Sequence, residues 1–175
     1  AVTSSAPISI TDLVTEFGGS TPHALTEYYR GGSLVPDNSA NSGIPTSGAI
    51  SLTDFFGATN TVTWTTTQTN GQGSGKLPLV GYSDGLSGTF GSVSDNSIDF
   101  LSKTYKALWH RVAGLEVGTH FQIQDNSTAW TSITIAGTTI ARTSFSTGSN
   151  GEFWLDSSTN YVGSSGAEIT VVLTQ

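Results

Sequence analysis

The sequence predicts a mainly β protein: an antiparallel β-sandwich, jelly-roll-like, preceded by an N-terminal arm with short helical turns. One short phrase occurs three times in the first 58 residues. From about residue 59, short runs alternate apolar residues with Thr and Ser and are separated by turn residues. Only 11% of the residues are charged, against about 25% in an ordinary domain. We therefore predict two parts, a docking segment over residues 1–58 and a β-sandwich over residues 59–175.

The repeated phrase consists of an apolar residue, a threonine, an acid and two apolar residues. Its copies are residues 10–14, 25–29 and 52–56, and a glycine follows each one. Threonine is a good N-cap, an acid in the first turn suits the helix dipole, and glycine permits the left-handed conformation that ends many helices. Each copy is predicted to form a helix of one or two turns, which must pack on this chain or on a neighbouring chain to be stable.

Between the second and third copies, residues 31–48 are rich in Gly, Ser, Asn and Pro. This composition argues against a helix or a central strand. Leu34, Val35 and Ile44 are the apolar positions that could pin such a loop to a surface. We predict an ordered arm that lies across a partner.

The second part contains a series of predicted strands. The first half of residues 62–67 alternates apolar and hydroxyl residues as a half-buried strand does. Residues 70–75 are predicted as a glycine-rich turn, and Pro78 places the strand over residues 77–82 at a sheet edge. Ala136-Gly137 is predicted to be a two-residue hairpin turn, because glycine supplies a positive φ. The other predicted strands are 86–91, 100–101, 105–112, 119–124, 132–135, 138–142, 152–155 and 169–173.

The apolar positions of these strands define a predicted core. Aromatic residues at such positions could alternatively be platforms that stack on sugars, but aromatics generally dominate core energetics. The predicted core residues are Trp64, Leu108, Phe121, Ile123, Ile133, Ile135, Trp154, Val171 and Leu173.

Composition also bounds the function. The net charge is −7, and the six Lys and Arg residues are scattered, which disfavours nucleic acids and anionic membranes as partners. Cysteine is absent, so disulfides and thiolate metal sites are excluded. There is no apolar run of about 20 residues and no pattern typical of a signal peptide. We expect a protein made in a cytoplasm and not inserted into a membrane.

The sequence offers weak signals for chemistry. His110 and His120 could meet on adjacent strands and form a metal site with Asp99 or Glu116, but ordinary polar strand positions explain both histidines. A glycosidase needs two facing carboxylates, whereas the acids here lie near turns, where Asp bonds to the backbone. We predict no enzyme and no cofactor. The acids considered are Asp84, Asp95, Asp99, Asp125 and Asp156.

Several phrases resemble known proteins. Residues 8–12, 16–20, 27–32 and 44–58 look like a segment near the start of tail-fibre, tail and other structural proteins of tailed-bacteriophage virions. More weakly, the C-terminal part is similar to a β domain of phage tail-associated proteins. The stretches that carry this second resemblance are 81–85, 90–93, 131–142 and 162–166.

The resemblance implies a non-enzymatic virion component, assembled in the host cytoplasm, that is homo-oligomeric (a trimer is plausible) and binds other virion proteins. It implies a tail, collar or fibre-associated protein; the alternatives are a capsid decoration protein (cement or head-fibre) and a carbohydrate-binding module for attachment to a host surface glycan. Aromatic and Arg residues dominate protein–protein hot spots, although internal packing of the short helices is an equally good role for them. The predicted docking residues are Leu13, Phe17, Tyr28, Tyr29, Arg30, Phe55 and Phe56. The predicted glycan contacts are Trp109 and Trp130.

Overall fold

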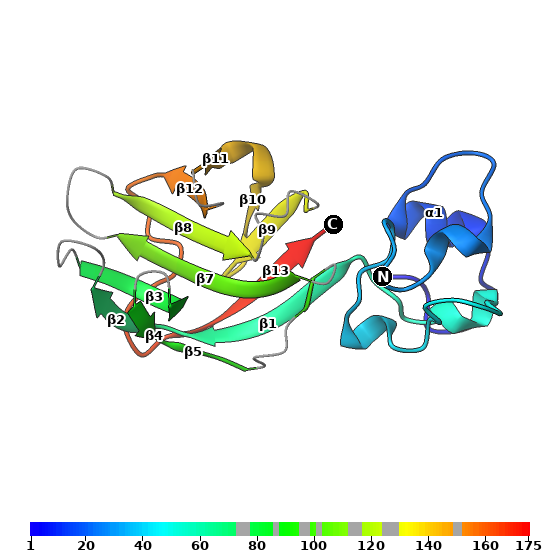
Figure 1. Ribbon diagram of the computed structural model, residues 1–175, viewed down its shortest axis with the longest axis horizontal. Coiled ribbons are helices and arrows are strands. Elements are labelled where there is room, and N and C mark those ends of the chain that lie inside the picture. The colour runs from blue at the N-terminus through cyan, green and yellow to red at the C-terminus, as the bar shows by residue number, and fades with distance from the viewer. Residues whose placement is uncertain are drawn as a thin grey trace. The chain divides into compact units, whose positions relative to one another are not determined.

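The chain divides into two compact units (Figure 1). Unit 1 comprises Ala1–Val62, Asp99–Ser102 and Thr174–Gln175, and unit 2 comprises Thr63–Ile98 and Lys103–Leu173. The sequence places a boundary after residue 58, and the structural division follows Val62. The computed structural model describes residues 1–72, 78–85, 88–94, 99–100, 103–111, 117–123, 130–148 and 152–175.

The three copies of the repeated phrase all form short helices, as predicted. The helices of unit 1 are α1 (Ile10–Phe17) and the 3₁₀ helices η1 (Leu25–Tyr28), η2 (Ser39–Asn41) and η3 (Leu52–Phe55). Gly18 ends α1 with a φ of 75°, and its N–H donates to the carbonyl oxygen of Val14. Within the described residues, none of the helices is long and apolar enough to cross a membrane.

The prediction that threonine caps each helix is wrong. The N-caps are Ser9, Ala24 and Ser51, which stand one residue before the repeated phrase. The backbone N–H of Ser9 donates to the Asp12 carboxylate at 2.8 Å, and that of Ser51 donates to the Asp54 carboxylate at 2.8 Å. The acid is therefore the third helical residue and completes a capping box with serine. The N-cap of the second copy is an alanine, Ala24, which has no side-chain oxygen, and its helix therefore has no capping box.

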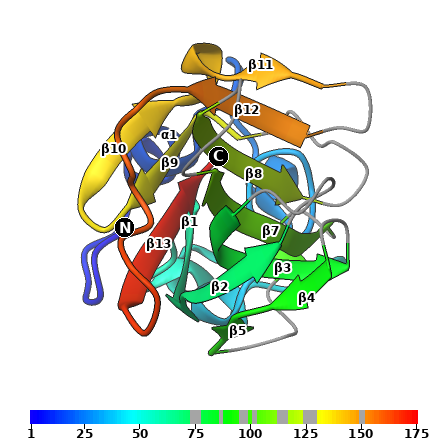
Figure 2. The ribbon, with the colours of Figure 1, turned by 90° about the vertical axis from the view of Figure 1, so that its left-hand side faces the viewer.

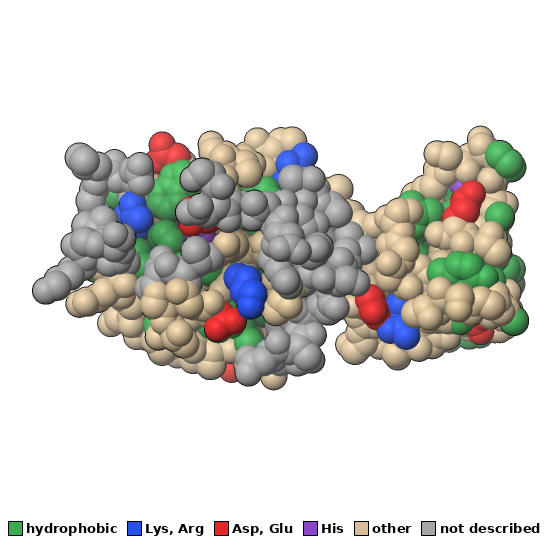
Figure 3. Space-filling model, in the orientation of Figure 1, with side chains coloured by type: hydrophobic (Ala, Val, Ile, Leu, Met, Phe, Trp, Pro, Cys, Tyr) green, Lys and Arg blue, Asp and Glu red, His purple; other side chains and the backbone are tan. Residues whose placement is uncertain are grey.

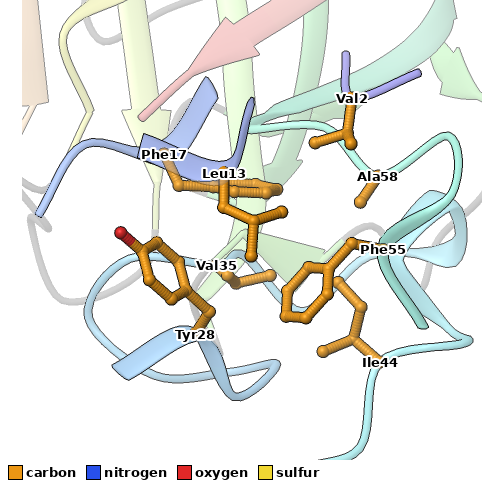
Figure 4. Close-up of a cluster of buried hydrophobic side chains, with 8 residues drawn as sticks. All are labelled: Val2, Leu13, Phe17, Tyr28, Val35, Ile44, Phe55 and Ala58. Atoms are coloured by element: carbon orange, nitrogen blue, oxygen red, sulfur yellow. The ribbon is translucent and has the colours of Figure 1, made fainter. Parts of the chain in front are cut away.

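Unit 1 has its own hydrophobic core, to which all three copies contribute (Figure 4). The ring of Tyr28 lies between two others, 6.4 Å from that of Phe17 and 6.3 Å from that of Phe55. The eight buried residues of this core are Val2, Leu13, Phe17, Tyr28, Val35, Ile44, Phe55 and Ala58.

The run over residues 31–48 packs within unit 1, and its contact with a partner stays a prediction. Val35 and Ile44 are buried in the core described above. Asn41 is also fully buried, and its side chain donates to the carbonyl oxygens of Pro36 and Thr59 and accepts from the Thr59 N–H, each at 2.9 Å. Because one buried amide satisfies three backbone groups, a loop of this composition can be ordered without regular structure.

The second part of the chain consists of strands. Residues 70–72, which were predicted as turn, instead belong to β2, and the remainder of that predicted turn lies outside the described residues. A 3₁₀ helix, η6 (Arg142–Ser144), follows β10. The strands are β1 (Thr61–Thr67), β2 (Thr69–Gln72), β3 (Pro78–Gly85), β4 (Gly88–Phe90), β5 (Ser92–Val93), β6 (Asp99–Phe100), β7 (Lys103–Arg111), β8 (Gly118–Ile123), β9 (Ser132–Ile135), β10 (Thr138–Ala141), β11 (Ser146–Thr147), β12 (Glu152–Asp156) and β13 (Glu168–Thr174).

Two antiparallel sheets make the sandwich-like arrangement of unit 2, so the predicted fold class is confirmed (Figure 2). One sheet has the order β10-β9-β13-β1-β5, and the other has the order β11-β12-β8-β7-β3-β2, with β4 paired to β3. The hairpin of β9 and β10 turns at Ala136 and Gly137, whose φ values are 48° and 85°. The predicted two-residue hairpin turn is thus confirmed, and its two successive positive φ values are typical of type I′.

The prediction that Pro78 marks an edge strand is wrong. β3 lies inside its sheet, with β2 on one side and β7 on the other. Pro78 is the first residue of the strand, and it stands opposite Gln72 of β2. Proline is tolerated at the first position of a strand, because the missing N–H interrupts little of the hydrogen-bond ladder there.

All but one of the predicted core residues are buried, and Trp154 is the exception. Register explains the difference, because Phe153 of β12 stands opposite Phe121 of β8 and both side chains are fully buried. Successive side chains of a strand point to opposite faces. Trp154 therefore points away from the interior of the sandwich, to the outer face of its sheet.

Candidate functional site

Four of the predicted docking residues are internal to unit 1. Leu13, Tyr28 and Phe55 are fully buried, and Phe17 is 8% exposed. The three capped turns thus cover one another's apolar faces and do not leave them for a partner. These four side chains pack their own unit, and a partner could reach them only if the unit opened.

The other three predicted docking residues reach the surface. The Tyr29 hydroxyl donates to the Gly48 carbonyl oxygen at 2.5 Å, and Arg30 forms an ion pair with Asp37, so both half-buried side chains also hold the loop in place. Phe56 is 37% exposed and is the one exposed large hydrophobic side chain within the described residues. It is the docking residue that the structure leaves most available.

The two predicted glycan contacts have different surroundings. Trp130 is 1% exposed, and its ring packs edge-on against Phe121, Phe145 and Phe153 inside the sandwich. It therefore offers no surface to a ligand. Trp109 is also almost completely buried, but it lies on the outer face of the sheet and lines a pocket.

This pocket, which we call the aromatic pocket, has a volume of about 300 Å³. Its floor is a row of side chains across three neighbouring strands, because Trp109 of β7 pairs with His120 of β8, and His120 pairs with Trp154 of β12. The remaining lining residues come from β11, from the residue that follows it, and from the strand ends nearby. The pocket is lined by Trp109, Arg111, His120, Ser146, Thr147, Gly148, Glu152 and Trp154.

Ring contacts order the pocket floor. The Trp109 and His120 rings stack with centroids 4.2 Å apart and planes within 7° of each other. The guanidinium carbon of Arg111 lies 5.7 Å from the Trp109 ring centroid and 5.5 Å from that of Trp154, within the range of cation–π attraction. A Cβ at position 118 would approach the Trp154 ring to 2.7 Å, so Gly118 makes room for that indole.

The pocket holds a neutral histidine together with one carboxylate and one guanidinium. Burial, with a smaller contribution from the Arg111 charge, lowers the pKa of His120 to about 3. The Glu152 carboxylate is 4.0 Å from His120 Nδ1 and does not offset that burial, so this approach is not an ion pair at neutral pH. Arg111 and Glu152 therefore contribute one positive and one negative charge, and their sum is zero.

The predicted meeting of His110 and His120 does not occur. His110 stands opposite Thr119, and the register that pairs His120 with Trp109 places the two histidines on opposite faces of the sheet. His110 Nδ1 instead lies 3.1 Å from the Thr119 hydroxyl. Glu116 and the Asp99 side chain are outside the described residues, and those that are described include no group of three or more potential metal ligands.

Sequence reasoning missed most of the aromatic pocket. It named Trp109, but it assigned Trp154 to the core and considered His120 only as a metal ligand, while Arg111 and Glu152 were not singled out. The signal that could have found the pocket is the alternation along β7, β8 and β12, once the register between them is known. Of the acids considered for hydrolysis, Asp84 and Asp156 do not line the pocket, and the side chains of the other three lie outside the described residues. Glu152 is the single carboxylate among the described residues of the lining.

Fold and site together define a class: a mainly β protein of two units, whose sandwich has an aromatic pocket with one acid and one guanidinium. Comparison with known proteins adds no narrower identification, because no family model, no curated protein and no solved structure matches the chain.

Proposed function

We propose that the chain is a non-enzymatic structural component of a phage virion, a tail, collar or fibre-associated protein. In this proposal unit 1 docks onto another virion protein and unit 2 is displayed. The observation that carries it is that the segment with the resemblance, including all three copies of the repeated phrase, forms a compact unit with a buried core of its own. A segment of that kind is suited to serve as a module joined to a separate display unit.

The surface chemistry is compatible with binding to protein. Phe56 is an exposed aromatic side chain, and Tyr29 and Arg30 are only partly buried in the same unit. Large aromatic residues and arginine are the residue types that contribute most to protein–protein interfaces. Among the described residues on the face drawn in Figure 3, Lys and Arg side chains stand singly within each unit, which favours a protein partner over a nucleic acid.

The docking role is tested by incorporation into particles. Phages that lack the chain are complemented with the full-length protein, with a variant lacking residues 1–58, and with Phe56→Ser; purified particles are then assayed for the chain by immunoblot. We expect the deletion to abolish incorporation and Phe56→Ser to reduce it at least tenfold. Thr53→Ser, an exposed position of η3, is the matched control and should be incorporated normally. Normal incorporation of the deletion variant would show that unit 1 is not the anchor.

The alternative location is the capsid, where the chain would act as a decoration protein. The number of copies per particle separates the two locations. A decoration protein is expected in numbers comparable to the major capsid protein, whereas a tail or collar protein is expected in a few dozen copies or fewer. Quantitative mass spectrometry of purified particles measures this ratio directly, and light scattering of the isolated protein tests the expected homo-oligomer.

A further inference from the structure

The aromatic pocket contains two buried polar atoms without partners. Trp109 Nε1 and His120 Nε2 are both inaccessible to solvent and make no hydrogen bond, although each residue lines the pocket. Trp109 and His120 are 3% and 2% exposed. An unsatisfied buried polar atom is unfavourable and calls for an explanation in function or in bound water. The residues that carry these two atoms stack on each other and line the pocket, which marks its floor as a place for groups that form hydrogen bonds.

A hydroxyl group is the chemistry that satisfies both atoms. The indole N–H can only donate a hydrogen bond, whereas the free nitrogen of a neutral imidazole either donates or accepts, depending on the tautomer. A hydroxyl does both, directly or through a bridging water. The rim of the pocket offers matching partners, because Glu152 can accept from hydroxyls, Arg111 can donate to them, and Ser146 and Thr147 can do either.

The charges of the pocket give no net attraction to a ligand of either sign. The cation position over the two indoles is already filled by Arg111, at 5.7 Å and 5.5 Å from the ring centroids, so an ammonium ligand finds it occupied. An anionic ligand that approached Arg111 would also approach Glu152, which lines the same 300 Å³ space. The charges of the carboxylate and the guanidinium cancel, and a neutral ligand avoids the repulsion that a charged one would meet from the group of its own sign.

We propose that the aromatic pocket binds one neutral sugar residue, either free or at the end of a glycan. Trp154, which is half-buried, would contact the apolar C–H face of the ring, while Glu152 and Arg111 would bond its hydroxyls. The volume is at the lower end of the range for ligand pockets, which matches one sugar ring and not a long chain. The inference is independent of the proposed docking of unit 1, because all of the lining residues belong to unit 2.

Titration calorimetry of the full-length chain tests the proposal. The probes are methyl glucoside, methyl galactoside and N-acetylglucosamine as neutral sugars, N-acetylneuraminic acid as an anionic sugar and glucosamine as a cationic one, with an array of neutral oligosaccharides in parallel. For at least one neutral sugar we expect a dissociation constant of about 1 mM, a free energy near −4 kcal/mol. Charged sugars should bind at least tenfold more weakly.

Variants locate the binding. Trp154→Ala and Glu152→Gln should each weaken it at least tenfold, whereas Ser164→Ala, in a separate surface depression of unit 2, should leave it unchanged. Circular dichroism verifies that each variant is folded. If Trp154→Ala does not fold, Glu152→Gln alone tests whether the sugar binds in the aromatic pocket.

Each other outcome overturns the proposal. Equal binding by all variants would place the sugar elsewhere, and preference for a charged sugar would refute the ligand class. If neither calorimetry nor the array detected binding of any sugar, sugar binding would be refuted altogether. None of these results bears on incorporation into particles, so the two proposals fail separately.

Discussion

Acid should destabilise unit 2 through the buried imidazole of His120. The side chain is 2% exposed, and its pKa is about 3 in the folded protein, against 6.5 for an accessible histidine. Between these two values the unfolded chain binds a proton that the folded chain excludes. The free energy of unfolding must therefore fall as the pH falls from about 6.5 towards 3, and it recovers as the pH is raised.

The size of the effect follows from the two pKa values. Each tenfold difference in proton affinity corresponds to 1.36 kcal/mol. At pH 5 about 30 unfolded chains carry the proton for each one that does not, while the folded imidazole is almost entirely neutral. The expected loss from His120 alone is about 2 kcal/mol between pH 7.5 and pH 5. The neighbouring charges do not reverse this sign: the Arg111 charge lowers the pKa further, and the Glu152 carboxylate 4.0 Å away does not compensate for burial.

Tryptophan fluorescence provides the assay, because Trp64, Trp109, Trp130 and Trp154 all belong to unit 2. Urea unfolding is followed at pH 7.5 and pH 5 for the wild type and for His120→Gln, which removes the titrating group. The variant is expected to be less stable at pH 7.5 but to lose about 2 kcal/mol less than the wild type on acidification. His110→Gln is measured in the same way, because burial also lowers the pKa of His110 and this histidine therefore contributes to the loss of stability in acid with the same sign. A pH dependence in His120→Gln equal to that of the wild type would refute the reasoning.

Three further predictions concern single side chains. Asp54→Ala removes the acceptor of a capping box and should lower the free energy of unfolding of unit 1 by about 1 kcal/mol, measured by hydrogen exchange of peptides from residues 1–62. Glu27→Ala replaces the equivalent acid of the copy without a capping box and should lower it clearly less. Phe55→Ala opens a cavity in the fully buried core of unit 1 and should cost about 3–5 kcal/mol by the same measurement, while the tryptophan-monitored unfolding of unit 2 stays unchanged. Gly81→Ala brings a Cβ within 2.4 Å of the backbone of β7, whereas no heavy atom lies within 4 Å of the Cβ that Gly85→Ala adds. In urea unfolding, Gly81→Ala should therefore destabilise unit 2 by roughly 1–3 kcal/mol more than Gly85→Ala does. Equal losses of stability would contradict this prediction.

Local sequence signals predicted the elements of the fold well. The alternation in residues 62–67, the Ala136-Gly137 turn and the three short helices all appear where the sequence places them. These features depend on residues that are close together in the chain. The prediction of the N-caps failed at the same short range, because serine and the acid form a reciprocal pair of bonds that threonine, inside the helix, cannot replace.

The features that the sequence did not predict depend on pairing between strands that are far apart in the chain. Pro78 reads as an edge residue, yet β2 and β7 flank its strand, and only the sheet order reveals this. The face on which Trp154 lies depends on whether Phe121 pairs with residue 153 or 154, and a shift of one residue would exchange core and surface. The candidate site was therefore only partly predictable, since Trp109 was named for its residue type and not for its position.

By itself, the sequence determined that this protein is mainly β and that its opening part is a repeat of short helices. It also determined that few residues are charged and that the net charge is negative, which disfavours nucleic acid as a partner. Composition and local periodicity are enough for these conclusions, because they reflect interactions between neighbours along the chain. Only the tertiary structure decided that the three helices bury one another's aromatic rings, and that an acid, a guanidinium, an imidazole and two indoles line one pocket. These side chains come from strands separated by many residues, and hydrogen-bond register alone sets which of them are neighbours.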